Sequence, residues 1–175
     1  MKQSILKMIW LLVLVSSVHL YYSVDVQAKP DEEKQIEEFI KGNNYLPAKK
    51  AITMFEQQHD RTVSLPKRLP FRPSHKFGQI TNEGDLRLHY LRVFNKPHQD
   101  FIFSIMSPES KIDKHITPED KVITLRDGTK AYYQNANDLN TLIFKKKGWG
   151  YIFSGNLKQS KDFGLEGLIE IAESI

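Results

Sequence analysis

Residues 121–154 constrain the fold of this 175-residue chain more than any other stretch. Asp127-Gly128 lies between two runs rich in β-branched and aromatic residues, which is a strong sequence signal for a tight β-hairpin. We expect a type I′ turn at these two residues, because that turn needs positive φ at both central positions and Asp-Gly tolerates it. A second hairpin is expected to close at residues 145–148. The centre of the chain is therefore predicted to be antiparallel sheet.

The periodicity of apolar residues predicts the other elements of the fold. Helical spacing and period-two alternation are both present, and neighbouring strands follow one another through short turns rather than helices. This arrangement predicts an α+β fold, with a curved antiparallel sheet of about six or more strands packed against N-terminal helices and a C-terminal helix. The expected helices are 31–42, 47–59 and 165–175, and the expected strands outside the central hairpins are 77–81, 85–94 and 101–107.

Three segments are predicted to lack regular structure. Residues 63–73 contain three prolines, which exclude a helix interior and a central strand, so we expect an extended linker. Its apolar side chains are expected to pack against the core. Residues 108–118 are mostly polar and are predicted to form a surface loop, and residues 135–140, rich in Asn and Asp, are predicted to form another.

The N-terminus has the layout of a secretory signal peptide. Two early lysines precede the apolar run 8–22, and a Val-x-Ala pattern ends at Ala28, where cleavage is expected. We therefore predict an extracellular or cell-surface protein, with an uncleaved N-terminal membrane anchor as the alternative. The mature part is expected to form one domain, in which a helical segment (29–62) precedes the sheet and closing helix (63–175).

Composition narrows the possible functions. The chain has no cysteine, which excludes disulfides, thiolate metal sites and a cysteine nucleophile. Its formal net charge of +4 favours anionic surfaces such as cell-wall polymers or lipid headgroups, but it is too small to indicate nucleic-acid binding. No histidine spacing typical of a metal site is present, so we expect neither a metal nor a cofactor.

Aromatic side chains on the predicted strands are the main candidate ligand-binding surface. They are interpreted either as the packed core of the sheet or as the lining of an apolar cleft for a lipid or an apolar peptide. The candidates are Trp149, Tyr151, Phe153, Tyr132, Phe101 and Phe103. The lysine run Lys145, Lys146 and Lys147 is either a solvated hairpin tip or, together with Lys121 and Lys130, a basic rim for an anionic envelope polymer.

No catalytic motif accompanies these surfaces, so we expect a non-enzymatic envelope binding or sensing module, with membrane contact only through an uncleaved leader. Two alternatives remain open. A secreted hydrolase or lyase would use the neighbourhood of Asp85, His89 and His98, provided that the fold brings these side chains together. A structural or inhibitory protein would instead bind its partner along an unpaired sheet edge.

Four motifs support a resemblance to a protein family: the proline-punctuated Leu65–Phe71, the hairpin Asp127–Tyr132, the run Gly148–Tyr151 and the tail Gly167–Ile175. Over residues 63–175 the chain resembles uncharacterised extracytoplasmic domains of spore-forming bacteria, which occur in anti-sigma-factor-like proteins and in secreted proteins and lipoproteins. That family is similar in turn to the lipoprotein-carrier fold. The resemblance implies a curved sheet wrapped around helices, and it implies no catalytic residues.

Overall fold

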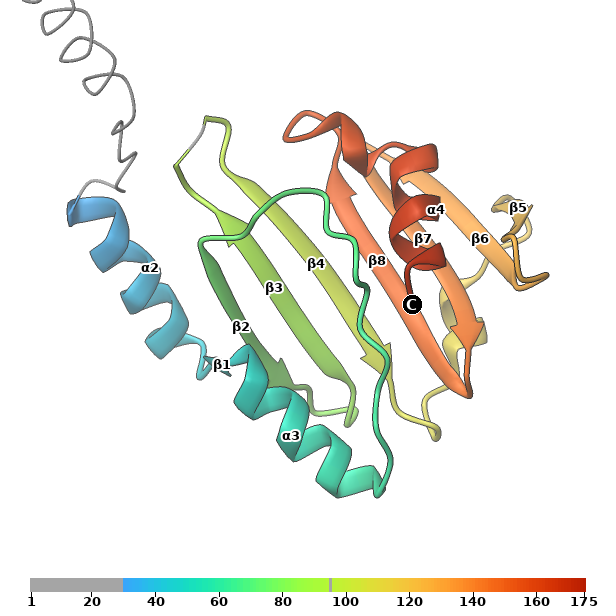
Figure 1. Cartoon of the computed structure of the whole chain (residues 1–175), viewed down its shortest axis with the longest axis horizontal. Helices are drawn as coiled ribbons and strands as arrows, with labels where there is room; N and C mark the ends of the chain where they lie inside the picture. Colours follow the sequence, from blue (N-terminus) through green and yellow to red (C-terminus); the bar gives the residue numbers. More distant parts are fainter. Residues whose placement is uncertain (1–29, 95) are drawn as a thin grey trace, which may run out of the picture.

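The computed structural model describes residues 30–94 and 96–175, so the predicted leader lies outside the described residues. The described chain forms one open antiparallel sheet of eight strands in the order β1-β2-β3-β4-β8-β7-β6-β5 (Figure 1). The strands are β1 (Leu46–Pro47), β2 (His75–Ile80), β3 (Leu86–Arg92), β4 (Gln99–Met106), β5 (Lys121–Thr124), β6 (Lys130–Ala136), β7 (Leu139–Lys146) and β8 (Trp149–Asn156).

The helices confirm the predicted α+β class. They are α2 (Pro30–Gly42), α3 (Ala48–His59) and α4 (Leu165–Glu173), with short 3₁₀ helices η1 (Ile112–His115) and η2 (Lys161–Phe163). Within the described residues, no helix is both long enough and apolar enough to cross a bilayer. The two N-terminal helices and the closing helix therefore surround a sheet built from consecutive strands, as the sequence pattern indicates.

One side of the sheet, which we call the inner face, carries the hydrophobic core. It presents residues such as Leu88, Phe103 and Tyr151, which pack against α3, α4 and the covering segment (residues 63–73). Figure 1 shows all three of these elements lying across the same side of the strands. The opposite side, the outer face, carries residues such as His89 and Ile143. It is overlaid by α2 near β2 and by the crossing segment (residues 107–120), which leads from β4 to β5.

The covering segment is extended and packs on the core, as predicted from its prolines. Phe71 is buried, and Leu65 and Leu69 are partly buried against the core cluster. The segment is also attached to the closing helix, because the Lys67 and Arg68 amides donate hydrogen bonds to the backbone and the side chain of Ser174. It therefore joins the two helices that cover the inner face.

The prediction of a type I′ turn at Asp127-Gly128 is wrong. Gly128 has a φ of 83°, but Asp127 is not in the left-handed region. The Gly128 amide donates to the Leu125 carbonyl at 2.9 Å, and the Leu125 amide donates to the Thr129 carbonyl at 2.9 Å, the pattern of a type I turn with a glycine bulge. The Asp127 carboxylate accepts a hydrogen bond from the Thr129 amide at 3.0 Å, which favours this turn.

Two other hairpins have positive φ at both central residues. These are Asn137-Asp138, at 51° and 65°, and Lys147-Gly148, at 50° and 75°. The first of them shortens the loop predicted at 135–140, because β6 and β7 continue to Ala136 and Leu139. The predicted loop was therefore too long. Asn135 and Asn140, which indicated a loop, pair with each other across β6 and β7.

The crossing segment is less solvent-exposed than the polar loop predicted for residues 108–118. Ile112 lies in η1 and is only 2% exposed, packed with Met106 and Ile143 on the outer face. Gly150 leaves the space for it, since a Cβ at this position would come within 2.7 Å of the Ile112 side chain. Ile112, with the partly buried Ile116, thus packs the middle of the segment against the sheet.

A glycine on β8 makes a similar space on the inner face. A Cβ on Gly155 would overlap the ring of Phe163, which is fully buried. Gly155→Ala is therefore expected to lower the free energy of unfolding by about 1–3 kcal/mol through overpacking. Denaturant unfolding measures this, with Gly42→Ala as the matched control, because a Cβ on Gly42 meets nothing within 4 Å.

Adding Phe163→Leu to Gly155→Ala should recover part of the loss, because the smaller side chain relieves the overlap. Equal stability of Gly155→Ala and Gly42→Ala would contradict this account of the packing.

Candidate functional site

Five of the six aromatic candidates lie in the hydrophobic core. Each is at most 2% exposed, and none offers surface to a ligand in this structure. They are Trp149, Tyr151, Phe153, Phe101 and Phe103. The aromatic face that these residues form is therefore covered by α3, the covering segment and α4.

The polar atoms of two of these aromatic residues also point into the protein. Trp149 Nε1 donates to the Thr62 carbonyl at 3.1 Å, and the Tyr151 hydroxyl donates to the Ser64 carbonyl at 3.1 Å. Burial raises the pKa of Tyr151 to about 12. Both bonds attach the chain around the start of the covering segment to β8, so their role is structural.

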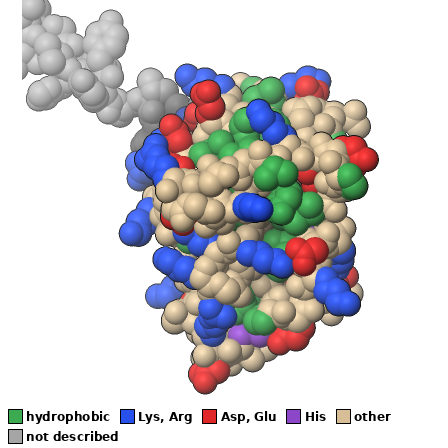
Figure 2. Space-filling view, turned by 90° about the vertical axis from the view of Figure 1, so that its right-hand side faces the viewer, with side chains coloured by type: hydrophobic (Ala, Val, Ile, Leu, Met, Phe, Trp, Pro, Cys, Tyr) green, Lys and Arg blue, Asp and Glu red, His purple; other side chains and the backbone are tan. Residues whose placement is uncertain are grey.

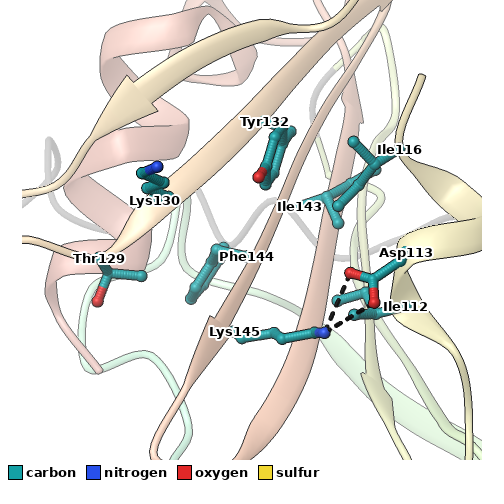
Figure 3. Close-up of a pocket in the computed structure, with 9 residues that line it drawn as sticks. All are labelled: Ile112, Asp113, Ile116, Thr129, Lys130, Tyr132, Ile143, Phe144 and Lys145. Carbon is teal, nitrogen blue, oxygen red and sulfur yellow. Dashed lines mark hydrogen bonds and ion pairs between the residues drawn. The ribbon is translucent and has the colours of Figure 1, made fainter. Parts of the chain in front are cut away.

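The sixth candidate, Tyr132, lies on the outer face. Ala131 pairs with Phe144 on the inner face, so the next residue on β6 points the other way, opposite Ile143. There Tyr132 lines a pocket of about 280 Å³ between the crossing segment and strands β6 and β7. Figure 3 shows this outer-face pocket, with Tyr132, Ile143 and Ile116 along one side and the Lys145–Asp113 ion pair along another.

The three candidate lysines do not form one basic rim, because their amines go to different partners. Lys145 forms an ion pair with Asp113 at 3.0 Å beside the outer-face pocket. Lys146 forms one with Asp127 at 3.0 Å. The Lys147 amine contacts the Ser64 hydroxyl at 3.4 Å and the Ile175 carbonyl at 3.5 Å, near the end of the chain.

Lys130, one of the two further lysines considered for the basic rim, differs from these three. It lines the outer-face pocket, and within the described residues its amine has neither an ion pair nor a hydrogen bond. The β6–β7 register places it beside Lys145 on the same face, since Ala131 pairs with Phe144. Sequence could not identify this site, because Lys130 becomes a neighbour of Ile112 and Ile116 only after the crossing segment folds over the sheet.

The structure does not bring together the residues of the hydrolase or lyase alternative. Asp85 Oδ1 accepts hydrogen bonds from the Ser107 amide at 2.8 Å and the Ser110 hydroxyl at 2.6 Å, which anchor the start of the crossing segment. His98 is exposed and lines a separate apolar pocket under α2. His89 is buried and is hydrogen-bonded to neither of the other two.

His89 instead belongs to a chain of three polar side chains. Its Nδ1 lies 3.1 Å from Asp100 Oδ2, and its Nε2 lies 3.1 Å from the Tyr45 hydroxyl. The ring also stacks on Phe77. Burial is the main cause that raises the pKa of Tyr45, so this phenol remains protonated and is suited to hydrogen bonding rather than to nucleophilic attack. The chain connects the residues between α2 and α3 to the sheet.

No group of three or more His, Cys, Asp or Glu side chains that could hold a metal ion occurs among residues 30–94 and 96–175. The polar groups at the outer-face pocket are two amines, a phenol, a hydroxyl and a carboxylate. This set is chemically suited to holding an anionic group next to an apolar one.

The raised pKa of Tyr151 predicts a pH dependence of stability. The hydroxyl ionises near pH 10 in the unfolded chain and near pH 12 in the folded protein. Its contribution is fully present below pH 10 and is lost as pH rises through this window, by up to about 1.4 kcal/mol per pH unit. Urea unfolding across this range should show a smaller fall for Tyr151→Phe than for the wild type. Parallel curves would contradict the assignment.

Searches of protein families, of curated proteins and of solved structures found no match to this chain.

Proposed function

We propose that this protein is a non-enzymatic binding module of the cell envelope that takes a lipid-like amphiphilic anion in the outer-face pocket. The ligand would place an apolar chain between the crossing segment and β6–β7 and its anionic group at Lys130. The observation that carries this proposal is an amine without a partner at the edge of an apolar hollow. The signal-peptide layout of residues 1–28 supports the envelope setting.

The apolar part of the pocket comes from both of its sides. Ile112 and Ile116 contribute from the crossing segment, and Tyr132 and Ile143 contribute from the sheet. A hydrocarbon chain placed there would leave water for an apolar surface, which contributes about 25 cal/mol per Å² buried. The volume of about 280 Å³ suits a short acyl chain. The pocket is therefore large enough for one chain and too small for a whole phospholipid.

The charged part of the pocket favours an anion. Lys130 is free to donate to a carboxylate or phosphate, and Lys145 lies beside it on the neighbouring strand. Lys145 can exchange its partner Asp113 for a ligand, because their ion pair joins two exposed side chains and such pairs stabilise a protein only weakly. An incoming anion can therefore share Lys145 at little cost.

The proposed activity is binding rather than catalysis, because the candidate acid–base residues lie elsewhere. Asp85 is engaged in anchoring the crossing segment, and His89 lies in its own chain with Tyr45 and Asp100. At the pocket itself the groups are suited to holding an anion in place. The resemblance to extracytoplasmic domains, which implies no catalytic residues, agrees with this proposal.

Isothermal titration calorimetry with decanoate tests the proposal. Decanoate should bind the wild-type protein, and decanol should bind more weakly because it lacks the charge. Lys130→Gln should weaken decanoate binding about tenfold through loss of one charge-assisted hydrogen bond. Lys121→Gln is the matched control, since this lysine lies on β5 and does not line the pocket. It should bind decanoate like the wild type.

Equal affinity of Lys130→Gln and the wild type for decanoate, or no binding by either, would contradict the proposal. Ile143→Asp provides a second check. It leaves Lys130 in place and introduces a carboxylate into the apolar wall, so decanoate binding should disappear. Circular dichroism should establish that each variant is folded. Native mass spectrometry of protein purified from its own culture should show a co-purifying acyl compound.

A further inference from the structure

The strand β5 forms one edge of the open sheet and has a partner on one side only. It pairs with β6 in the register Lys121–Tyr133, Val122–Tyr132, Ile123–Ala131 and Thr124–Lys130. The bond from the Leu125 amide to the Thr129 carbonyl fixes which residues point toward β6. Because this direction alternates along an antiparallel strand, the N–H and C=O groups of Val122 and Thr124 point outward.

These outward groups are not covered. Within the described part of the chain, no hydrogen bond involves the backbone of Val122 or Thr124 on the outer side of β5. The Val122 side chain is 58% exposed, more than any other large hydrophobic side chain of the described residues. An edge with unpaired backbone groups and an exposed β-branched side chain is a template for a further strand.

The opposite edge of the sheet is unsuited to that role. Its strand, β1, has only two residues, and one of them is Pro47, which has no N–H to donate. Figure 1 shows β1 between α2 and α3, which leave little edge on either side. The sheet therefore has one edge that can accept a partner strand, and it is β5.

Charge indicates what kind of strand fits β5. Lys121 on β5 and Lys130 on the neighbouring strand have no ion pair among the described residues, whereas Lys145, Lys146 and Arg126 nearby are each paired with a carboxylate. Figure 2 shows hydrophobic side chains gathered in the middle of the face that carries β5 and β6, with Lys and Arg side chains among and around them. Glu119 and Asp120, which precede β5, also have no ion pair among the described residues and offset Lys121. The uncompensated positive charge therefore lies at the Thr124 end of the edge, at Lys130.

We propose that β5 binds an extended peptide segment of a partner protein as a ninth strand, and that this segment carries β-branched residues and an Asp or Glu at the end that lies beside Lys130. Main-chain hydrogen bonds to Val122 and Thr124 supply the pairing. The carboxylate at that end reaches Lys130. This interaction shares Lys130 with the acyl ligand proposed above. Its main-chain hydrogen bonds are separate from that ligand, because the outward groups of β5 do not line the outer-face pocket.

The test uses the acetylated and amidated peptide Glu-Thr-Val-Thr-Val-Glu and the mature protein. The peptide should bind and should slow hydrogen exchange at Val122 and Thr124. Two matched peptides separate the contributions. Replacing both Glu by Lys should weaken binding about tenfold, because in either strand direction it sets a like charge beside Lys130. N-methylating the two Val residues should abolish binding, because it removes the donors that a strand contributes.

Val122→Pro tests whether the backbone of β5 itself takes part in the pairing. This change removes an outward N–H but no bond to β6, and edge strands tolerate proline in that orientation. Peptide binding should be lost in Val122→Pro and retained in Val122→Thr, while both variants keep the wild-type circular dichroism spectrum. Binding that survives Val122→Pro or peptide N-methylation, or the absence of any binding by the wild type, would overturn the proposal.

Discussion

The structure depends on covering one wide, apolar sheet face with few elements. Eight strands at about 4.8 Å spacing span about 34 Å, whereas α3 has 12 residues and α4 has 9, so their lengths are only about 18 and 14 Å. The two helices cannot cover the inner face alone. The covering segment lies between them and supplies Phe71 and backbone acceptors for β8. The prolines keep this segment extended, and its hydrogen bonds to Ser174 attach it to α4.

Because the inner face needs this much covering, it forms the core. The surfaces proposed to bind partners lie on the outer face and at the sheet edge. The elements α3, α4 and the covering segment lie on the inner side, so among the described residues only α2 and the crossing segment lie over the outer face. The crossing segment is held by Ile112 above Gly150 and by the hydrogen bonds that Asp85 accepts. Beside Ile112 the segment leaves the pocket shown in Figure 3, and beyond it β5 has no strand on its outer side in the described part of the chain.

Sequence patterns identified most elements but missed some of their environments. The helices, the strand order along the chain and the buried apolar residues of the covering segment follow from local periodicity and from proline. The Asp127-Gly128 turn was assigned the wrong type, because a side-chain bond to the Thr129 amide selects a different turn. The burial of Ile112 was overlooked, because Ile112 and Ile116 are two isolated apolar residues in a polar segment that is too short to show a clear period.

At the candidate site, Tyr132 shows most clearly which features the sequence predicts and which it does not. Alternation along β6 separates Tyr132 from its neighbour Ala131, and that much is visible in the sequence. Which of the two shares a face with Trp149 depends on the register across β7, where a shift of one residue would exchange the faces.

The sequence by itself determined the class of fold, the extended covering segment and the apolar residues of the core. Tertiary structure alone decided which face is filled, where Lys130 meets an apolar hollow and which edge stays open, because these depend on contacts between residues far apart in the chain.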